Sequence, residues 1–111
     1  MSDIQDLQRR ILQFRDERNW AQFHTPKDVA MCLSIEAAEL LELFLWKKPD
    51  EAPELERVRE ELADVLYSAL LLASHFEIDV HKAVVDKLEK NAQKYPVAES
   101  WGKNRKYDER P

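Results

Sequence analysis

The chain has 111 residues, 44% of them apolar and 35% charged, with a single glycine. This length suits one domain, and this composition favours long helices over tight β-turns, so we predict an all-α fold. The formal net charge of -5 argues against a protein that binds nucleic acid polymers, because neutralising phosphates requires a basic surface. The single cysteine excludes an intrachain disulfide, and neither a signal-peptide pattern nor a membrane span is evident, so we expect a cytoplasmic protein.

The first half of the chain predicts two helices. One runs from about residue 2 to residue 18, where apolar residues recur at spacings of three and four. The next begins after Thr25, which can cap it, has Pro26 at its first position and continues to about Lys47. It is apolar on nearly every side, which predicts a helix buried by its neighbours at the centre of the fold.

Two more helices and a tail are predicted in the second half. After a proline-bounded linker, a helix runs from about residue 54 to residue 76, and its second half is nearly all apolar. Asp79 can cap a fourth helix, which continues to about Lys94. We therefore predict one domain over residues 1–96 and a C-terminal tail over residues 97–111.

Two pairs of carboxylates carry the clearest chemical signal. Glu36 and Glu39 lie three residues apart in the second helix, and Glu61 and Asp64 lie three apart in the third. This spacing puts both members of a pair on one helix face, and antiparallel packing of the two helices would bring the pairs together. Four negative charges at one point would protonate, separate or bind a cation. Oxygen ligands alone suit Mg²⁺ or Mn²⁺, and Mg²⁺ commonly takes part of its shell from substrate phosphates.

Residue chemistry alone leaves a second interpretation of these acids open. Acidic residues at helical spacing often form a solvated face, although Glu36 and Glu39 lie among apolar neighbours, where an unpaired charge is costly. A di-iron helical bundle also clusters carboxylates, but it requires a histidine three residues after a glutamate on two helices. No histidine in the sequence has that spacing. Metal binding and a solvated face therefore both stand, and di-iron chemistry does not.

Several sequence blocks are more specific than the two acidic pairs. The pairs read EAAE at 36–39 and ELAD at 61–64, and longer blocks around them read NWAQFHTPKD, EAAELLELFLWK, EELADVL and KLEKNAQKYP. Together they resemble the MazG-like all-α nucleotide pyrophosphohydrolases, and in particular the dCTP pyrophosphatase branch, over most of residues 4–97. The resemblance implies a four-helix protomer that assembles through its helices into a dimer or tetramer, with active sites between neighbouring subunits.

The resemblance also implies roles for individual polar residues. Magnesium would be held by Glu36, Glu39, Glu61 and Asp64. Either Glu36 or Glu39 would also act as the catalytic residue that orients or deprotonates the attacking water. The triphosphate and sugar would be bound by Lys87, Asn91, Lys94 and Tyr95. The first three of these lie at i, i+4 and i+7, so one helical face can present them.

By the same resemblance, Trp20, His24 and Trp46 would line the base pocket, where aromatic side chains can stack on a nucleobase. Residue chemistry alone instead favours core packing for the tryptophans, because large aromatic residues usually pack. Two positions depart from some animal relatives, which carry a histidine at the position of Ile11 and a tyrosine at the position of Ser68. The preferred base is therefore left open.

These inferences predict a magnesium-dependent hydrolase that converts a (deoxy)nucleoside triphosphate to the monophosphate and pyrophosphate. The resemblance implies dCTP or a related or modified dNTP as the substrate, and a role in nucleotide-pool sanitation. We expect the tail to order over the site through Lys106 and Tyr107. The alternatives are a dUTP or general NTP pyrophosphohydrolase, and a non-catalytic helical module that binds a partner through its apolar third helix.

Overall fold

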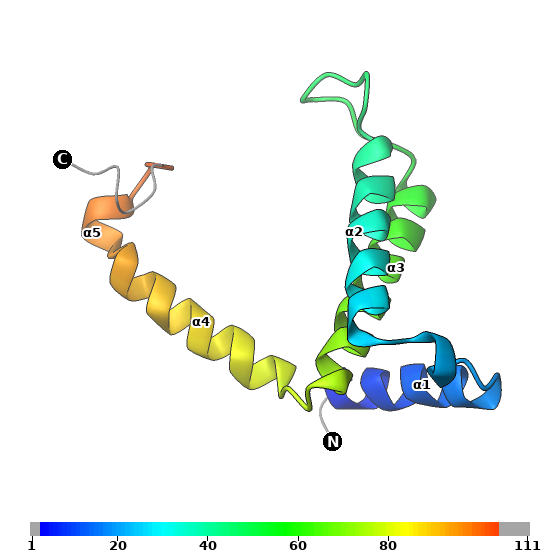
Figure 1. The fold of residues 1–111 in the computed structure, drawn as a ribbon. Helices are drawn as coiled ribbons and strands as arrows, with labels where there is room; N and C mark the ends of the chain where they lie inside the picture. Colours follow the sequence, from blue (N-terminus) through cyan, green and yellow to red (C-terminus); the bar gives the residue numbers. More distant parts are fainter. Residues whose placement is uncertain (1–2, 105–111) are drawn as a thin grey trace. The chain divides into compact units, whose positions relative to one another are not determined.

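Every element in the part of the chain that the structure describes is a helix. The computed structural model describes residues 3–104 (Figure 1). In chain order the elements are α1 (Asp3–Glu17), the 3-10 helix η1 (Ala21–Phe23), α2 (Pro26–Glu42), α3 (Leu55–His75), α4 (Val80–Lys94) and α5 (Val97–Ser100). The predicted all-α class is confirmed, and α1, α3 and α4 begin and end close to their predicted bounds.

The chain forms two compact units, residues 1–78 and residues 79–111, and each is described by itself. The first contains α1, η1, α2 and α3, and the second contains α4 and α5. The predicted domain boundary after residue 96 lies inside the second unit, between α4 and α5, and stays a prediction. Lys106 and Tyr107, on which the predicted closure of the tail depends, lie outside the described residues.

In the first unit, α2 and α3 lie side by side and antiparallel, and α1 contacts α3 (Figure 1). Gln8 of α1 donates from Nε2 to the carbonyl oxygen of Leu70 at 3.4 Å and to Oγ of Ser74 at 3.3 Å, which ties α1 to the second half of α3. The buried apolar core of the described chain is small. It consists of Val29, Leu43, Leu70, Leu71 and Ala73.

Side-chain caps begin α2 and α4 as predicted. The side chain of Thr25 accepts a hydrogen bond from the amide of Asp28 at 3.2 Å, and Pro26 occupies the first position of α2. In α4, the carboxylate of Asp79 accepts from the amide of Lys82 at 3.0 Å. Each cap satisfies an amide that has no partner within its helix.

The end of α1 places Trp20. Asn19 follows the helix with a φ of 55°, in the left-handed region that asparagine tolerates better than most residues. The amide of Trp20 donates to the carbonyl of Arg15 at 3.0 Å, and that of Asn19 to the carbonyl of Asp16 at 3.1 Å, which is a Schellman motif. The reversed chain brings Trp20 back onto Phe14, with ring centroids 5.7 Å apart in an edge-to-face arrangement.

The prediction that the second helix continues to Lys47 is wrong, because α2 ends at Glu42. After Glu42 the amides of Leu43 and Phe44 bond carbonyls three residues back rather than four, so the chain tightens into turns. Trp46 then takes a φ of 66°, which a bulky residue adopts rarely and which cannot continue an α-helix.

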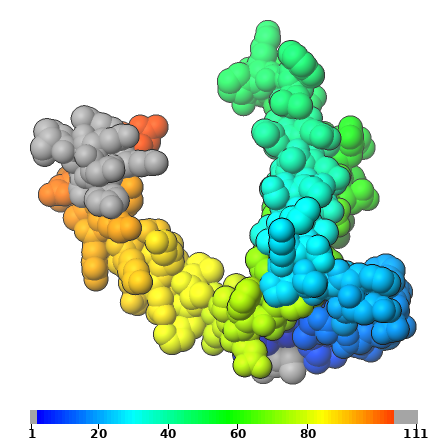
Figure 2. Space-filling view, in the orientation of Figure 1, coloured from blue at the N-terminus to red at the C-terminus, as the bar shows by residue number. Residues whose placement is uncertain are grey.

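Much of the apolar surface of the first unit is exposed. Val29 is the only buried residue among those of α2, and Met31, Ile35 and Leu41 on the same helix are each more than half exposed. Figure 2 shows the cyan side chains of α2 along the outside of the unit. The single chain therefore does not bury α2 at the centre of the fold as predicted, because in the first unit α3 is its principal packing partner. None of the helices described combines the length and apolar character needed to cross a membrane.

The left-handed turn at Asn19 can be tested by substitution. Asn19→Ile should lower the free energy of unfolding by about 1–2 kcal/mol, because a β-branched residue is strained at this φ. Asn19→Gly should change it by only a few tenths of a kcal/mol, because glycine adopts positive φ without a steric penalty. Urea unfolding followed by circular dichroism would measure both, and equal stability of the two variants would contradict this account of the turn.

Candidate active site

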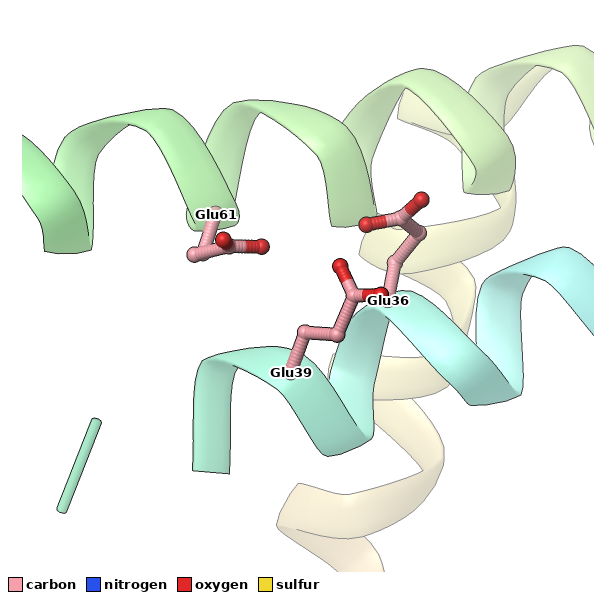
Figure 3. A group of neighbouring side chains, drawn as sticks. All are labelled: Glu36, Glu39 and Glu61. Carbon is pink, nitrogen blue, oxygen red and sulfur yellow. The ribbon is translucent and has the colours of Figure 1, made fainter. Parts of the chain in front are cut away.

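Three glutamates from two helices meet between α2 and α3. Glu36 and Glu39 come from one face of α2, and Glu61 comes from the facing side of α3 (Figure 3). One carboxylate oxygen of each lies within 4.8 Å of the others. In an octahedral Mg²⁺ site, neighbouring ligand oxygens lie about 3 Å apart and opposite ones about 4.2 Å, so these three oxygens would have to move closer together to share one ion. The predicted convergence of the two acidic pairs is therefore seen for three of the four acids.

The electrostatics of the cluster are unfavourable without a cation. Burial raises the pKa of Glu36 above its ordinary value, and the carboxyl groups of Glu39, Asp64 and Glu61 raise it further. Burial also raises the pKa of Glu61, with Glu39 and Asp64 adding to the effect and Arg57 opposing it. One oxygen of Glu36 and one of Glu61 are buried without a hydrogen-bond partner in the described structure. Buried polar atoms normally have partners, so these two oxygens are suited to a ligand such as a metal ion.

Asp64 lies at the edge of this cluster. It is exposed and does not belong to the close group of three, but it is near enough to raise the pKa of both Glu36 and Glu61. It also lines a neighbouring pocket. Asp64 therefore connects the acidic cluster to the pocket beside it.

That pocket, which we call the aromatic pocket, has a volume of about 470 Å³ and lies between α1, α3 and Trp20. Its lining residues are Leu7, Arg10, Ile11, Phe14, Trp20, Asp64 and Tyr67. Phe14 contacts both Trp20 and Tyr67 edge to face, with centroids 5.7 and 6.5 Å apart. Small-molecule sites commonly have this volume and this mixture of an apolar wall with a few polar groups.

The predicted base-binding residues lie in different parts of the first unit. Trp20 lines the aromatic pocket and is 42% exposed. His24 follows η1, and its Nδ1 is buried without a hydrogen-bond partner in the described structure. Trp46 is fully exposed in the loop after α2. Trp20 precedes α2 and Trp46 follows it, and the 17 residues of the helix between them span about 25 Å.

The predicted triphosphate-binding residues belong to the second unit. Lys87, Asn91 and Lys94 lie on α4, and Tyr95 is its C-terminal cap residue, with its amide donating to the carbonyl of Asn91 at 2.8 Å. Asn91 and Tyr95 are half-buried. Lys87, Asn91 and Lys94 stand at i, i+4 and i+7 of one helix, as predicted.

Sequence reasoning did not identify Arg10 or Tyr67 as site residues. A signal for Arg10 was present, because it falls between Leu7 and Ile11 on the apolar face of α1, where a cation is unusual. Tyr67 stands three residues after Asp64, the same spacing that joins the acidic pairs. Helical spacing from Leu7 and Ile11 would have identified Arg10, and helical spacing from Asp64 would have identified Tyr67.

Comparison with known proteins identifies the family. A family model described as MazG-like matches residues 31–109. The chain belongs to the MazG-like family. It is 39% identical to dCTP pyrophosphatase 1 of Mus musculus over 115 residues, which cover 97% of this chain and 68% of that protein, and 36% identical to dCTP pyrophosphatase 1 of Homo sapiens over the same shares.

A solved structure agrees with this membership. A pyrophosphatase from Archaeoglobus fulgidus DSM 4304 superposes with a TM-score of 0.77 at 42% sequence identity, over 86% of this chain and 94% of that one. The MazG-like match covers all three clustered glutamates and Asp64. Most of the aromatic pocket comes from α1 and Trp20, which precede the matched range. The acidic cluster is thus the part of the site that lies within the MazG-like match.

Replacing Glu36 should raise the stability of the metal-free protein and weaken its binding of metal. Because the pKa of Glu36 is raised in the folded protein, its ionisation destabilises the metal-free fold as pH rises through that pKa, and the penalty disappears at acid pH. Glu36→Gln should therefore raise the Tm of the EDTA-treated protein by a few degrees at mildly alkaline pH, with a smaller gain at acid pH.

Magnesium should stabilise the wild-type protein much more than Glu36→Gln. The wild-type protein should gain about 2.7 kcal/mol at a Mg²⁺ concentration 100 times its Kd, whereas Glu36→Gln should gain little. Glu42→Gln is the matched control, since it removes an exposed carboxylate of the same helix. Thermal unfolding with EDTA and with Mg²⁺ measures all three proteins, and a Glu36→Gln response equal to that of the control would reject the metal site.

Proposed function

We propose that this chain is a Mg²⁺-dependent nucleoside triphosphate pyrophosphohydrolase that converts dCTP, or a related or modified dNTP, to the monophosphate and pyrophosphate. The relatives named dCTP pyrophosphatase 1 and the pyrophosphatase of similar structure support the enzyme class. Mn²⁺ is the expected substitute ion, since the ligands are oxygens alone. Removal of unwanted nucleotides from the cellular pool is the corresponding role.

The observation that carries the proposal is the acidic cluster with its two unpartnered buried oxygens, lying beside the aromatic pocket. The three carboxylates that α2 and α3 bring together repel one another. A divalent cation and its phosphate ligands would offset this repulsion and so explain the arrangement. Asp64 lines the pocket and also raises the pKa of Glu36 in the cluster, so the two features are close together. A nucleotide with its base in the pocket would therefore have its phosphates near the acids.

The chemistry follows from this arrangement. When bound, Mg²⁺ would neutralise charge on the phosphate oxygens and lower the pKa of water. Glu36, Glu39, Glu61 and Asp64 would hold the ion. A water molecule attacks the α-phosphorus in line with the leaving pyrophosphate, forming one P–O bond as the α–β bridging bond breaks. Glu36 or Glu39 accepts the proton of that water, and the pKa of Glu36 is raised above its ordinary value, which favours this role.

The second unit supplies the positive charge that a triphosphate requires. Lys87 and Lys94 flank Asn91 on one face of α4. Ammonium groups bind phosphate oxygens as point charges, and an amide or phenol group can hold the sugar hydroxyl. We assign these residues and Tyr95 to the triphosphate and sugar.

A site that uses both tryptophans requires more than one chain. Trp20 precedes α2 and Trp46 follows it, and about 25 Å of helix between them is too long for both to hold one base ring. The exposed apolar side chains of α2 and α3 offer surface through which copies can associate. We therefore propose a homodimer or homotetramer in which Trp46 of one copy, together with Trp20 and His24 of another, completes the base site.

Product analysis with each dNTP and NTP tests the reaction. With Mg²⁺ the products should be the monophosphate and pyrophosphate, with dCTP or a modified dCTP among the best substrates, and EDTA should stop turnover. In H₂¹⁸O the label should appear in the monophosphate, because water attacks the α-phosphorus. Chromatography and mass spectrometry measure both results.

Variants of the cluster provide the control. Glu39→Gln should lower kcat/KM by about 10²–10⁴-fold, while Glu42→Gln, three residues further along α2, should stay near wild type. Release of orthophosphate or label in pyrophosphate would move the attack to another phosphorus. No turnover of any nucleotide by the wild-type protein would reject the enzyme and favour a binding module.

Mixing two variants tests the shared site. Trp20→Ala and Trp46→Ala should each lose about 10–100-fold in kcat/KM, because a base loses an aromatic stacking partner. Refolding the two together should restore about a quarter of wild-type activity in a dimer, since half the dimers are mixed and each mixed dimer has one intact site. Mixing the double variant with either single variant should restore none. No recovery in the first mixture would show that each site uses one chain.

A further inference from the structure

We propose that Arg10 determines base specificity by donating hydrogen bonds to the O2 and N3 acceptors of a cytosine ring in the aromatic pocket. This inference rests on the proposed function, because it concerns how that enzyme chooses among nucleotides. Arg10 lies outside the residues assigned above to the metal, the phosphates and the stacking wall. Its role would be to discriminate between cytosine and uracil, which have nearly the same shape.

The position of Arg10 on α1 is the first observation. Leu7, Arg10, Ile11 and Phe14 stand at i, i+3, i+4 and i+7, so they share one face of the helix, and all four line the pocket. Three of them are apolar, as expected for the side of a helix that faces inward. Arg10 is the one cation among the residues that line this pocket in the described chain.

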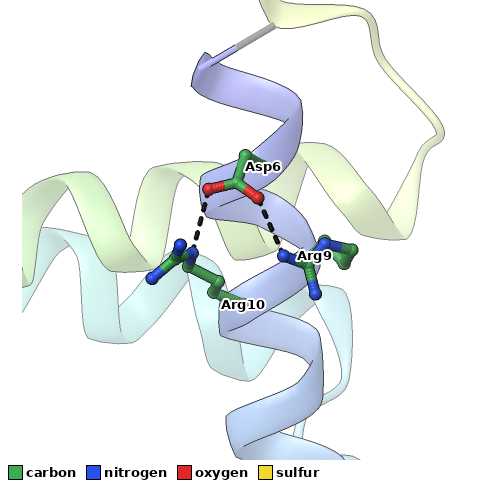
Figure 4. A network of polar contacts seen from close by, with 3 residues as sticks. All are labelled: Asp6, Arg9 and Arg10. Atoms are coloured by element: carbon green, nitrogen blue, oxygen red, sulfur yellow. Dashed lines mark hydrogen bonds and ion pairs between the residues drawn. The ribbon is translucent and has the colours of Figure 1, made fainter. Parts of the chain in front are cut away.

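Asp6 forms an ion pair with Arg10, whose side chain is 69% exposed. Oδ2 of Asp6 accepts from Nε of Arg10 at 2.9 Å, and Oδ1 accepts from Nη2 of Arg9 at 2.8 Å, so the carboxylate lies between the two arginines (Figure 4). The hydrogen bond from Arg9, assisted by that from Arg10, holds the pKa of Asp6 below its ordinary value, so Asp6 stays ionised at neutral pH. A planar guanidinium that is bound at Nε keeps its Nη groups for another partner.

The donors of Arg10 match one pyrimidine better than the other. Arginine donates through five N–H groups and accepts none, and four of these are on the two Nη atoms. Cytosine presents two adjacent acceptors, O2 and N3, which a guanidinium can bind bidentately. Uracil has a hydrogen on N3, so the same fork would meet a donor with a donor. Specificity often depends on such a mismatch against the wrong ligand.

The walls of the pocket suit the same ring. Trp20 is held in place by the Schellman turn and by its edge-to-face contact with Phe14, and Tyr67 packs against Phe14 from α3. These aromatic groups can contact the faces of a base while Arg10 reaches its edge. Asp64 is on the α3 side of the pocket, toward the acidic cluster. A base bound in this way would have its triphosphate near the catalytic acids.

The experiment compares kcat/KM for dCTP with kcat/KM for dUTP in the Mg²⁺-loaded enzyme. Arg10→Gln should lower the ratio of the two values by about tenfold, and Arg10→Lys should lower it less, because lysine keeps the charge but loses the fork. Arg9→Gln is the matched control. It removes the other arginine bound to Asp6 but does not line the pocket, so its ratio should stay at the wild-type value.

Each outcome decides the inference. An unchanged ratio in both Arg10 variants, or equal losses for both nucleotides, would overturn it and leave Arg10 with a phosphate-binding or structural role. A wild-type enzyme that hydrolyses dCTP and dUTP equally would also overturn it, while leaving the proposed function intact. If the wild-type protein hydrolyses no nucleotide, the proposed function itself fails. Circular dichroism tests whether the variants are folded. If Arg10→Gln does not fold, the comparison uses Arg10→Lys.

Discussion

The antiparallel packing of α2 on α3 is the constraint on which the rest of the site depends. It places Glu36 and Glu39 opposite Glu61, with one buried oxygen of Glu36 and one of Glu61 lacking a partner. A fold that gathers like charges loses stability, and the loss is recovered only when an ion occupies the cluster. This packing lowers the stability of the metal-free chain and would suit the binding of a cation. A cluster of side chains that lowers the stability of its own fold is typical of a functional site.

Two left-handed residues determine how the aromatic side chains are presented. Asn19 ends α1 and returns Trp20 to the apolar face of that helix, where it forms a wall of the pocket. Trp46 occupies the same region of φ after α2, although it is bulky and fully exposed. Asparagine adopts this conformation at small cost, whereas tryptophan does not. A contact with another chain or with a ligand would explain a strained and exposed tryptophan better than a contact within its own chain.

The amount of exposed apolar surface explains why this fold suits an assembly. Only five apolar residues of the described chain are buried, whereas large apolar side chains remain exposed on every long helix. A chain of this length buries a modest fraction of its surface, so association would add stability that the single chain lacks. A shared active site would then make catalysis depend on the same contacts that complete the core. Folding, assembly and activity would be linked through α2 and α3.

The sequence by itself determined the all-α class, the caps at Thr25 and Asp79, and the acidic pairs on α2 and α3, because helical periodicity and capping are local properties. It did not determine where α2 ends, since the turn after Glu42 depends on a backbone conformation that tryptophan rarely adopts. Only the tertiary structure showed that Asp64 borders both the cluster and the pocket, and that Arg10 belongs to that pocket. These relations depend on how α1 and α3 pack, and residues distant in sequence become neighbours only when helices are placed in space.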